Sequence, residues 1–379
     1  MPSNAALPAT ATRADAFRRF TTCRDALRIR PDPPPFHPPP PHRRKGRPPP
    51  AAPPRAATPP KSPRSPPLFP PPARHTDLAV GDDAALIRPR PGMQPAISTD
   101  MLVAGTHFFA DTDPKDLGWK TLAVNVSDLA AMGAEPRWVV LAASLPSADE
   151  GWIAPFAEGF FACCEAFGVD AIGGDTTRGP LNLCPTIFGE VPFGQAVTRS
   201  GGRAGDELWV SGAPGRAALG LAHLKSEIRL ATDWRDDCLA ALHRPQPRVA
   251  LGLALRGLAT AMLDVSDGLL GDLDHILELS GVGAEVDEAA LPLAPLIAAC
   301  GDPARAFQAC TAGGDDYELL FAAPAERRAD LLALSARLKL PLHCIGRLTR
   351  QAGRLQLRHA NGQLDDLAVR GYDHFGRTP

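Results

Sequence analysis

The sequence lacks the motifs of the common nucleotide-binding and hydrolytic folds. It contains no G-x-x-x-x-G-K-[ST] phosphate loop and no G-x-G-x-x-G turn between a strand and a helix. The loop motifs of protein kinases, the G-x-S-x-G elbow of hydrolases and the H-E-x-x-H pair of zinc peptidases are also absent. These absences argue against a P-loop, Rossmann, α/β-hydrolase or zincin fold.

Long apolar runs and paired cysteines are missing too. No segment approaches the roughly 18 apolar residues that a membrane-spanning helix needs, so we expect no membrane partner. The eight cysteines are scattered, without a C-x-x-C motif or paired histidines, which argues against a zinc site and a redox pair. We expect reduced cysteines that pack as small apolar side chains, and a cytoplasmic location.

Proline and positive charge are concentrated at the N-terminal end. Residues 31–72 hold 21 of the 42 prolines, and residues 1–76 hold 14 Lys and Arg against three Asp. The whole chain has a net charge of −2, so the remainder is acidic and we expect no nucleic-acid partner for it. We predict a disordered basic extension over residues 1–76. Two interpretations remain open: an arm that touches nucleic acid or a membrane surface, and an upstream extension of the reading frame.

Strand and helix patterns alternate after residue 76. Apolar runs and turn residues predict strands over residues 84–88, 96–103, 138–145, 169–172, 186–192, 207–211, 261–265, 284–286, 317–322 and 343–348. Helices are predicted over residues 113–132, 150–167, 248–258, 269–279 and 325–338, and from residue 215 onward. The alternation predicts an α/β protein with two domains, residues 77–193 and 194–379.

Aspartates recur where these apolar segments end. They lie in VGDDAALI, ISTDMLVAGTHF, LAVNVSDLAAMGA, IGGDTTRGP, LDVSDGLLGDL and AGGDDYELLF, with few cations nearby. Buried carboxylates repel one another unless they are paired or bind a metal ion. Oxygen ligands without His or Cys favour Mg²⁺, and adjacent glycines let backbone N–H groups approach an anion. The pattern therefore predicts a polyphosphate that is held through several Mg²⁺ ions.

Each of these positions also has a purely structural interpretation. An aspartate in a Gly-Asp turn is most often a turn or cap residue, and His107 is equally compatible with a hydrogen-bonded core position. Arg178 and Arg199 follow Gly- and Thr-rich turns, where a surface ion pair and a phosphate contact both remain open. Asp128 differs, because it lies inside an apolar helical stretch where no cap is needed, and there we favour a functional role.

Six segments of the sequence, five of them among these aspartate segments, occur in an order that resembles one known family. The sequence is similar to thiamine-monophosphate kinases, which belong to the aminoimidazole ribonucleotide synthetase-like (PurM-like) superfamily. The resemblance covers about residues 80–375 and rests on STDMLVAGTHF, GWKTLAVNVSDLAAMGAEPRW, GGDTTRGP, LDVSDGLLGDL, GGDDYEL and GYDHF. It implies an N-terminal mixed sheet that pairs across a homodimer and a C-terminal α/β layer domain, with ATP between the two domains.

The resemblance also implies roles for the matching residues. The Mg²⁺ ligands would be Asp83, Ser98, Thr99, Asp100, Asp128, Asp175, Asp264 and Asp267. Of these, the catalytic residues would be Asp100, Asp128 and Asp175. The contacts to ATP would come from Gly174, Asp175, Arg199 and Ser266. The substrate contacts would come from His107, Asp315 and Tyr372, where Asp315 replaces the longer Glu of many relatives.

The implied reaction converts ATP and thiamine monophosphate into ADP and thiamine diphosphate. A phosphate oxygen of the substrate attacks the γ-phosphorus of ATP in line, while several Mg²⁺ ions neutralise the two polyanions. Because that oxygen is already ionised at neutral pH, neither a general base nor a phospho-enzyme is required. The alternatives are another ATP-dependent enzyme of the same superfamily, and a non-catalytic protein that binds Mg²⁺ and a nucleotide.

Overall fold

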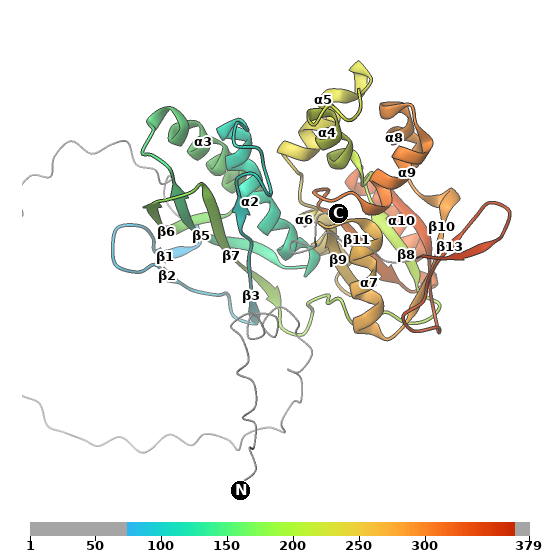
Figure 1. Ribbon diagram of the computed structural model, residues 1–379. Helices are drawn as coiled ribbons and strands as arrows, with labels where there is room; N and C mark the ends of the chain where they lie inside the picture. The colour runs from blue at the N-terminus through green and yellow to red at the C-terminus, as the bar shows by residue number, and fades with distance from the viewer. Residues whose placement is uncertain (1–73, 368–379) are drawn as a thin grey trace, which may run out of the picture. The chain divides into compact units, whose positions relative to one another are not determined.

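The computed structural model describes residues 74–367 (Figure 1). Residues 1–73 and 368–379 lie outside the described residues, and with them most of the predicted basic extension and the predicted substrate residue Tyr372. The described chain begins with a short hairpin of β1 (Thr76–Leu78) and β2 (Leu86–Ile87). This hairpin precedes the first of two larger sheets.

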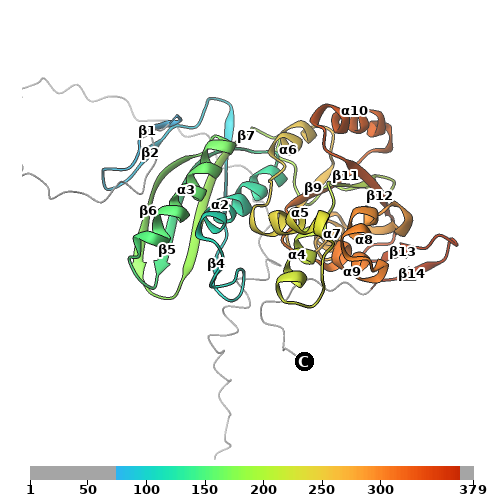
Figure 2. The same ribbon diagram turned by 90° about the horizontal axis from the view of Figure 1, so that it is seen from above.

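The N-terminal half is a mixed sheet with two helices on one face (Figures 1 and 2). The strand order is β3-β7-β5-β6, in which β5 and β6 are parallel and the other neighbours antiparallel, and β4 also pairs with β7. The strands are β3 (Met93–Thr99), β4 (Leu102–Val103), β5 (Glu135–Leu145), β6 (Asp170–Arg178) and β7 (Asn182–Pro192). Helices α2 (Pro114–Ala131) and α3 (Glu150–Phe167) bury their apolar side chains against this sheet.

Both ends of α2 follow from its sequence. The Asp113 carboxylate accepts hydrogen bonds from the backbone N–H groups of Lys115 and Asp116, and Pro114 takes the first helical position, where no N–H is needed. After the helix, Gly133 adopts a φ of +62°, which glycine tolerates best. The structure therefore confirms the helix that the sequence predicts here.

Helices α2 and α3 approach each other closely at two glycines. A Cβ atom on Gly159 of α3 would lie 1.8 Å from the carbonyl oxygen of Lys115. A Cβ atom on Gly118 of α2 would lie 2.0 Å from the carbonyl oxygen of Phe156. No larger residue fits at either position unless the helices move apart. This contact fixes the position of α2, which carries the predicted site residue Asp128.

The C-terminal half is a seven-stranded mixed sheet with helices on both faces (Figure 1). The strand order is β14-β13-β10-β12-β8-β11-β9, in which β10 and β13 are parallel and the other neighbours antiparallel. The strands are β8 (Glu207–Ser211), β9 (Ala261–Val265), β10 (Gly283–Asp287), β11 (Glu318–Ala323), β12 (Leu342–Thr349), β13 (Leu355–Arg358) and β14 (Leu364–Asp366). The helices are α4 (Arg216–Leu224), α5 (Thr232–His243), α6 (Val249–Leu255), α7 (Leu269–Ser280), α8 (Leu293–Cys300), α9 (Pro303–Ala312) and α10 (Arg328–Leu338), with short 3-10 helices η1 (Glu288–Ala290) and η2 (Ala325–Arg327).

Side-chain alternation divides the helices of this half between two cores. In β8, Leu208 and Val210 face a core shared with α4, α5, α7, α8 and α9, whereas Trp209 faces a core shared with α6 and α10. Strand β11 alternates in the same way, with Leu320 in the first core and Phe321 in the second. The predicted two-domain α/β architecture and the mixed N-terminal sheet are confirmed, and the structure adds that the C-terminal sheet is mixed as well.

The structure corrects several of the predicted elements. The strand predicted over residues 96–103 is interrupted at Asp100 and Met101, so that β3 and β4 are separate. The Asp100 N–H donates to Asn125 Oδ1 at 3.1 Å instead of joining a strand ladder, which accounts for the break. The strand predicted over residues 84–88 is reduced to two residues, and the sequence analysis assigned no helix to α5, α8 or α9.

Neither a membrane-spanning segment nor a disulfide occurs in the part of the chain that the structure describes. No helix of residues 74–367 combines the length and the apolar character that crossing a bilayer requires. The seven cysteines of this region are free thiols, and several are fully buried among apolar side chains. Burial raises the pKa of the Cys163 thiol well above its ordinary value, so this cysteine packs as a small apolar group, as predicted.

Candidate active site

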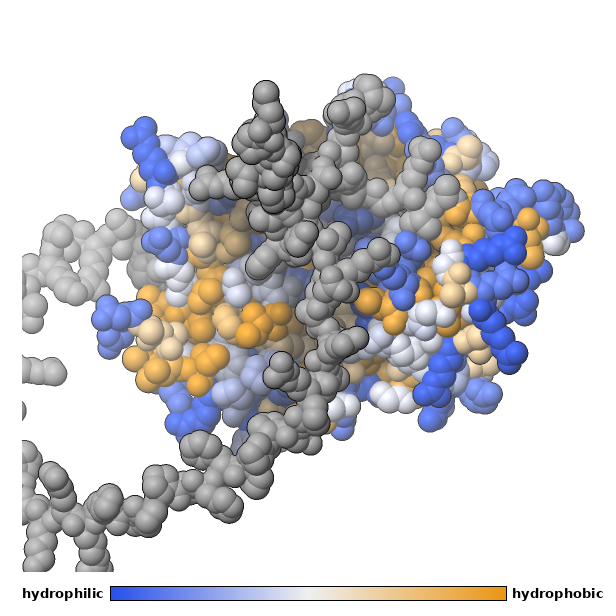
Figure 3. All heavy atoms as spheres, turned by 60° about the horizontal axis from the view of Figure 1, so that its bottom comes forward, coloured by the Kyte–Doolittle hydropathy of each residue, from blue (hydrophilic) through white to orange (hydrophobic). Residues whose placement is uncertain are grey.

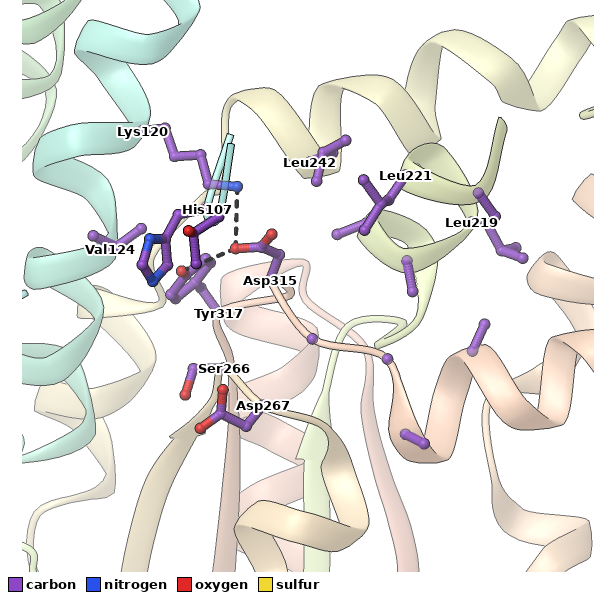
Figure 4. Close-up of a pocket in the computed structure, with 18 of the residues that line it drawn as sticks. His107, Lys120, Val124, Leu219, Leu221, Leu242, Ser266, Asp267, Asp315 and Tyr317 are labelled. Carbon is purple, nitrogen blue, oxygen red and sulfur yellow. Dashed lines mark hydrogen bonds and ion pairs between the residues drawn. The ribbon is translucent and has the colours of Figure 1, made fainter. Parts of the chain in front are cut away.

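A cavity of about 600 Å³ is lined by side chains from both halves of the described chain (Figure 4). Its walls come from α2, the turn between β3 and β4, α4, the end of β9 and the loop that leads into β11. The predicted site residues that line it are Asp100, His107, Asp128, Asp264, Ser266, Asp267 and Asp315. Residues that are far apart in the sequence therefore meet around one space.

Three carboxylates form an acidic cluster in this cavity. Asp100 follows β3, Asp128 lies on α2 and Asp264 lies in β9. The Ser98 hydroxyl donates to Asp128 Oδ2 at 2.5 Å, and the Ser127 hydroxyl donates to Asp264 Oδ2 at 2.6 Å. The second bond joins α2 to β9 and so connects the two halves at the site itself.

Burial and mutual repulsion raise the pKa values of all three carboxylates. Loss of hydration, followed by the charges of Asp264 and Asp267, raises the pKa of Asp100 to about 6. Loss of hydration, followed by the charge of Asp100, raises the pKa of Asp128 to about 7. The pKa of Asp264 is also raised to about 7, by burial and then by the charge of Asp128. The positive charge of Arg199 opposes the rise at Asp128 and Asp264, which places this arginine near the cluster.

The cluster has the chemistry of a divalent-cation site, although its atoms do not form a complete one. Among residues 74–367, no three His, Cys, Asp or Glu side chains converge closely enough to hold a metal ion. Buried carboxylates that raise one another's pKa are stabilised in their ionised forms when a positive charge lies between them. Carboxylates and hydroxyls are the hard oxygen donors that Mg²⁺ prefers. The residues present therefore fit Mg²⁺.

Other predicted ligands lie outside the lining of the cavity. Asp83 is exposed just before β2, and Gly174 and Asp175 are exposed on β6. Strand β6 is separated from β3 by β7 and β5, so the sheet order keeps Asp175 away from Asp100. The Thr99 hydroxyl donates to the Pro185 carbonyl oxygen at 2.9 Å within the β3–β7 pair. Their roles in metal or nucleotide binding stay predictions.

A second group of polar side chains lies in the wall of the cavity (Figure 4). Lys120 Nζ lies 3.0 Å from Asp315 Oδ1, and the Tyr317 hydroxyl donates to the same oxygen at 3.1 Å. Asp315 and Tyr317 have φ values of +69° and +53°, a backbone conformation that residues with side chains rarely adopt.

His107 Nδ1 accepts a hydrogen bond from the Val103 N–H at 3.0 Å, so Nε2 carries the proton of the neutral ring.

Lys120 and Tyr317 line the cavity but were not predicted from the sequence. Lys120, Val124 and Asp128 are spaced by four residues on α2 and all line the cavity, so they share one face of the helix. A lysine within an otherwise apolar helical run was the signal that could have identified this face. Tyr317 lies in the segment GGDDYEL, but its hydrogen bond to Asp315 depends on the loop conformation before β11 and was not predicted.

Asp272 is a further residue that the sequence analysis missed. It lies in the first turn of α7, where its Oδ2 accepts the backbone N–H groups of Ser266, Asp267 and Gly268 at 3.0–3.1 Å. Asp272 is only 4% exposed, and loss of hydration raises its pKa to about 7. The carboxylate therefore shapes the turn that brings Ser266 and Asp267 to the cavity.

Known proteins share this sequence and this fold. Residues 81–191 match the family described as AIR synthase related protein, N-terminal domain, and residues 203–358 match the corresponding C-terminal domain. The thiamine-monophosphate kinase of Escherichia coli strain K12 is 44% identical over 304 residues, which is 80% of this chain and 93% of that protein. The chain belongs to the thiamine-monophosphate kinase family.

Solved structures from this kinase family agree with the described architecture. The thiamine-monophosphate kinase from Stenotrophomonas maltophilia K279a is 45% identical with a TM-score of 0.71, covering 77% of this chain and 93% of that chain. AaThiL complexed with AMPPCP and TMP is 29% identical with a TM-score of 0.67, covering 78% of this chain and 92% of that chain. The two mixed sheets with their helices are therefore the PurM-like fold of the thiamine-monophosphate kinases.

Proposed function

We propose that this chain phosphorylates thiamine monophosphate with ATP, releasing thiamine diphosphate and ADP. The observation that carries the proposal is the convergence of Asp100, Asp128 and Asp264 around one cavity in a member of the thiamine-monophosphate kinase family. AaThiL, which has a similar fold, is solved with TMP and with AMPPCP, an analogue of ATP. Both substrates are polyanions, so a cavity rich in carboxylates requires added positive charge before it can hold them. Because ATP is abundant in the cytoplasm, the reaction is consistent with the predicted cytoplasmic location.

The acidic cluster is the proposed Mg²⁺ site. When bound, Mg²⁺ would neutralise the phosphates of both substrates and the charge that spreads over the group in transfer. Asp100, Asp128 and Asp264 would hold it from the cavity wall, together with Asp267. The hydroxyls of Ser98 and Ser127 orient two of these carboxylates by hydrogen bonds. The remaining proposed ligands are Asp83, Thr99 and Asp175.

The chain's own residues supply binding and orientation rather than proton transfer. The attacking phosphate oxygen of the substrate is ionised at neutral pH, so no side chain has to accept a proton from it. Arg199, near the acidic cluster, and Ser266, in the cavity wall, are proposed contacts to ATP, with Gly174 and Asp175. His107 and Asp315 in the cavity wall are proposed contacts to thiamine monophosphate, and Tyr372 completes the predicted set.

A product assay tests the proposal directly. The purified chain with ATP, Mg²⁺ and thiamine monophosphate should form thiamine diphosphate, detected by chromatography, and should leave free thiamine unchanged. Asp128→Asn should lower the rate by roughly 100-fold, because one of the charged groups at the site of phosphoryl transfer is lost. The matched control is Asp236→Asn, whose side chain is 83% exposed outside the cavity and which should retain the normal rate.

Two results would contradict the proposal. ADP formed only with a different phosphate or carboxylate acceptor, in a panel run beside thiamine monophosphate, would indicate another ATP-dependent enzyme of the superfamily. Calorimetric binding of Mg²⁺ and ATP by the folded protein with no turnover of any acceptor would indicate a nucleotide-binding protein. Normal turnover by Asp128→Asn would show that the Mg²⁺ site is assigned to the wrong carboxylates.

We further propose that the N-terminal sheet pairs with a second copy of the chain in a homodimer. Helices α2 and α3 cover one face of this sheet, and on β3 Ser98 points to that face, since it bonds Asp128 of α2. Ile97 therefore points to the opposite face, where it is 62% exposed, and Phe193 directly after β7 is 80% exposed. In Figure 3, apolar side chains gather over the part of the molecule that holds the N-terminal half. Large exposed apolar groups of this kind are typical of association surfaces.

Light scattering after size-exclusion chromatography tests the homodimer. The wild-type chain should have a mass near twice its 40.1 kDa. Ile97→Lys should shift the distribution toward the monomer, whereas Leu332→Lys, at an equally apolar position that is 52% exposed on α10, should leave the dimer intact. A monomeric wild-type protein would contradict the dimer without affecting the proposed reaction.

A further inference from the structure

Lys120 is a buried cation in the wall of the cavity. Its residue is only 4% exposed, although lysine is among the residues least often buried without a partner of opposite charge. On α2 it is followed at four-residue spacings by Val124 and Asp128, which also line the cavity. Figure 4 shows its side chain extending from α2 toward the loop before β11. Its position therefore places a positive charge on the cavity side of α2.

The partner of Lys120 is a carboxylate from the other half of the described chain. Lys120 Nζ lies 3.0 Å from Asp315 Oδ1, and the Tyr317 hydroxyl donates to the same oxygen at 3.1 Å (Figure 4). Oδ2 of Asp315 makes neither contact. The side chain of Asp315 is 29% exposed, against 5% for Lys120, so the carboxylate is the member of the pair that opens to the cavity. Lys120 thus pairs with one oxygen of a carboxylate that stays partly exposed in the cavity wall.

The backbone around Asp315 is held by separate bonds. Asp315 N–H donates to the Ser266 carbonyl oxygen and Tyr317 N–H donates to the Val265 carbonyl oxygen, each at 2.8 Å, which maintains the positive φ values of this loop. Between them, Asp316 faces elsewhere, since its Oδ2 accepts the N–H of Gly215 at 2.6 Å. These bonds fix the backbone, but the rotamer of Asp315 depends on the partners of its carboxylate. Among the described residues, these partners are the Lys120 ammonium, through an ion pair, and the Tyr317 hydroxyl, through a hydrogen bond.

Thiamine monophosphate has a part that suits such a carboxylate. Its thiazolium ring carries a positive charge and its pyrimidine ring carries an amino group with N–H donors, so a carboxylate oxygen at a fixed position binds and selects this end of the molecule. We propose that Lys120 is a positioning residue for substrate binding: its ammonium holds Oδ1 of Asp315 so that Oδ2 meets the cationic, amino-bearing end of thiamine monophosphate. This inference rests on the proposed function and adds to it a residue that acts through Asp315.

Steady-state kinetics of Lys120→Met tests the inference. The KM for thiamine monophosphate should rise roughly 10- to 100-fold, the range for losing one hydrogen bond to a charged group, while the KM for ATP and kcat change less than about twofold. Lys120→Arg should recover part of the loss, because it keeps the charge. The matched control is Lys115→Met, on the same helix, whose ammonium pairs with Glu158 on α3. It should leave both KM values unchanged.

A double-variant cycle separates positioning from a direct contact. If Lys120 acts through Asp315, the combination of Lys120→Met with Asp315→Asn should bind thiamine monophosphate no more weakly than Asp315→Asn alone, measured by calorimetry without ATP. Additive losses would overturn the inference, as would an unchanged or lower KM in Lys120→Met. If Lys120→Met fails to fold, Tyr317→Phe removes the other donor to Oδ1 and must raise the same KM. A wild-type protein that does not turn over thiamine monophosphate would instead refute the proposed function.

Discussion

For Gly159→Ala at the contact between α2 and α3, helix propensity and packing predict opposite changes in stability. Alanine is intrinsically better than glycine inside a helix by about 1 kcal/mol, so propensity alone predicts a more stable protein. The new Cβ atom, however, would lie 1.8 Å from the Lys115 carbonyl oxygen, where about 3.2 Å is needed for contact without overlap. The helices would have to separate by more than an ångström. We expect a net loss in the free energy of unfolding of about 1–3 kcal/mol, the range for overpacked cores.

The position of α2 links this stability change to the site. The same helix carries Lys120 and Asp128, so a displaced α2 should also raise the KM for thiamine monophosphate. Urea denaturation followed by circular dichroism measures the first effect and the product assay measures the second. Gly151→Ala is the matched control, because Gly151 lies on α3 like Gly159 and its Cβ would have a nearest neighbour at 3.2 Å, in the Asp149 side chain. A Gly159→Ala protein as stable as the wild type would refute the packing argument.

Two further predictions concern buried and surface carboxylates of the C-terminal half. Glu318 is 2% exposed and accepts hydrogen bonds from Arg248 Nε at 2.6 Å and from the Ser211 hydroxyl at 2.5 Å. Glu318→Gln should therefore lower the free energy of unfolding, measured by urea titration, by about 3 kcal/mol. A loss below about 1 kcal/mol would contradict this prediction. Partial burial raises the pKa of Glu285, but hydrogen bonds from Arg358 and Arg347 outweigh it and hold the pKa below the ordinary value. The ionised Glu285 carboxylate therefore stabilises the folded protein above the unfolded-state pKa of about 4.3. This stabilisation is lost as the pH falls through the lower folded-state pKa of Glu285. The stability gap between the wild type and Glu285→Gln should stay constant from about pH 6 to 8 and close under acid conditions, and a gap that widens on acidification would contradict the pairing.

Local signals in the sequence account for much of the fold. The Asp113-Pro114 pair and Gly133 predict where α2 begins and ends, because capping depends on neighbouring residues alone. Helices α8 and α9 were not recognised, since they are short and their stability comes mainly from packing on the sheet. The break between β3 and β4 was also missed, because it depends on Asn125, which lies 25 positions further along the chain.

The residues of the candidate site were also predictable only in part from the sequence. Asp100, Asp128 and Asp264 were recognisable because a carboxylate within an apolar segment needs an explanation, and the fold brings all three to one cavity. Lys120 was recognisable only as an unusual residue on one face of α2. Its pairing was not predictable, because its partner Asp315 lies almost 200 positions away and the contact exists only in the folded chain. Spacing along a sequence reveals a helix face, but it does not reveal what that face meets.

Helix α2 belongs to the cores of both halves. Its earlier turns pack against α3, whereas Ala131 at its end joins the core around α6, where a Cβ atom on Gly252 would lie 2.0 Å from the Ala130 carbonyl oxygen. Separating the two halves would therefore expose the end of α2 that packs on α6, so a fragment holding the N-terminal half alone should be less stable than that half is in the intact chain.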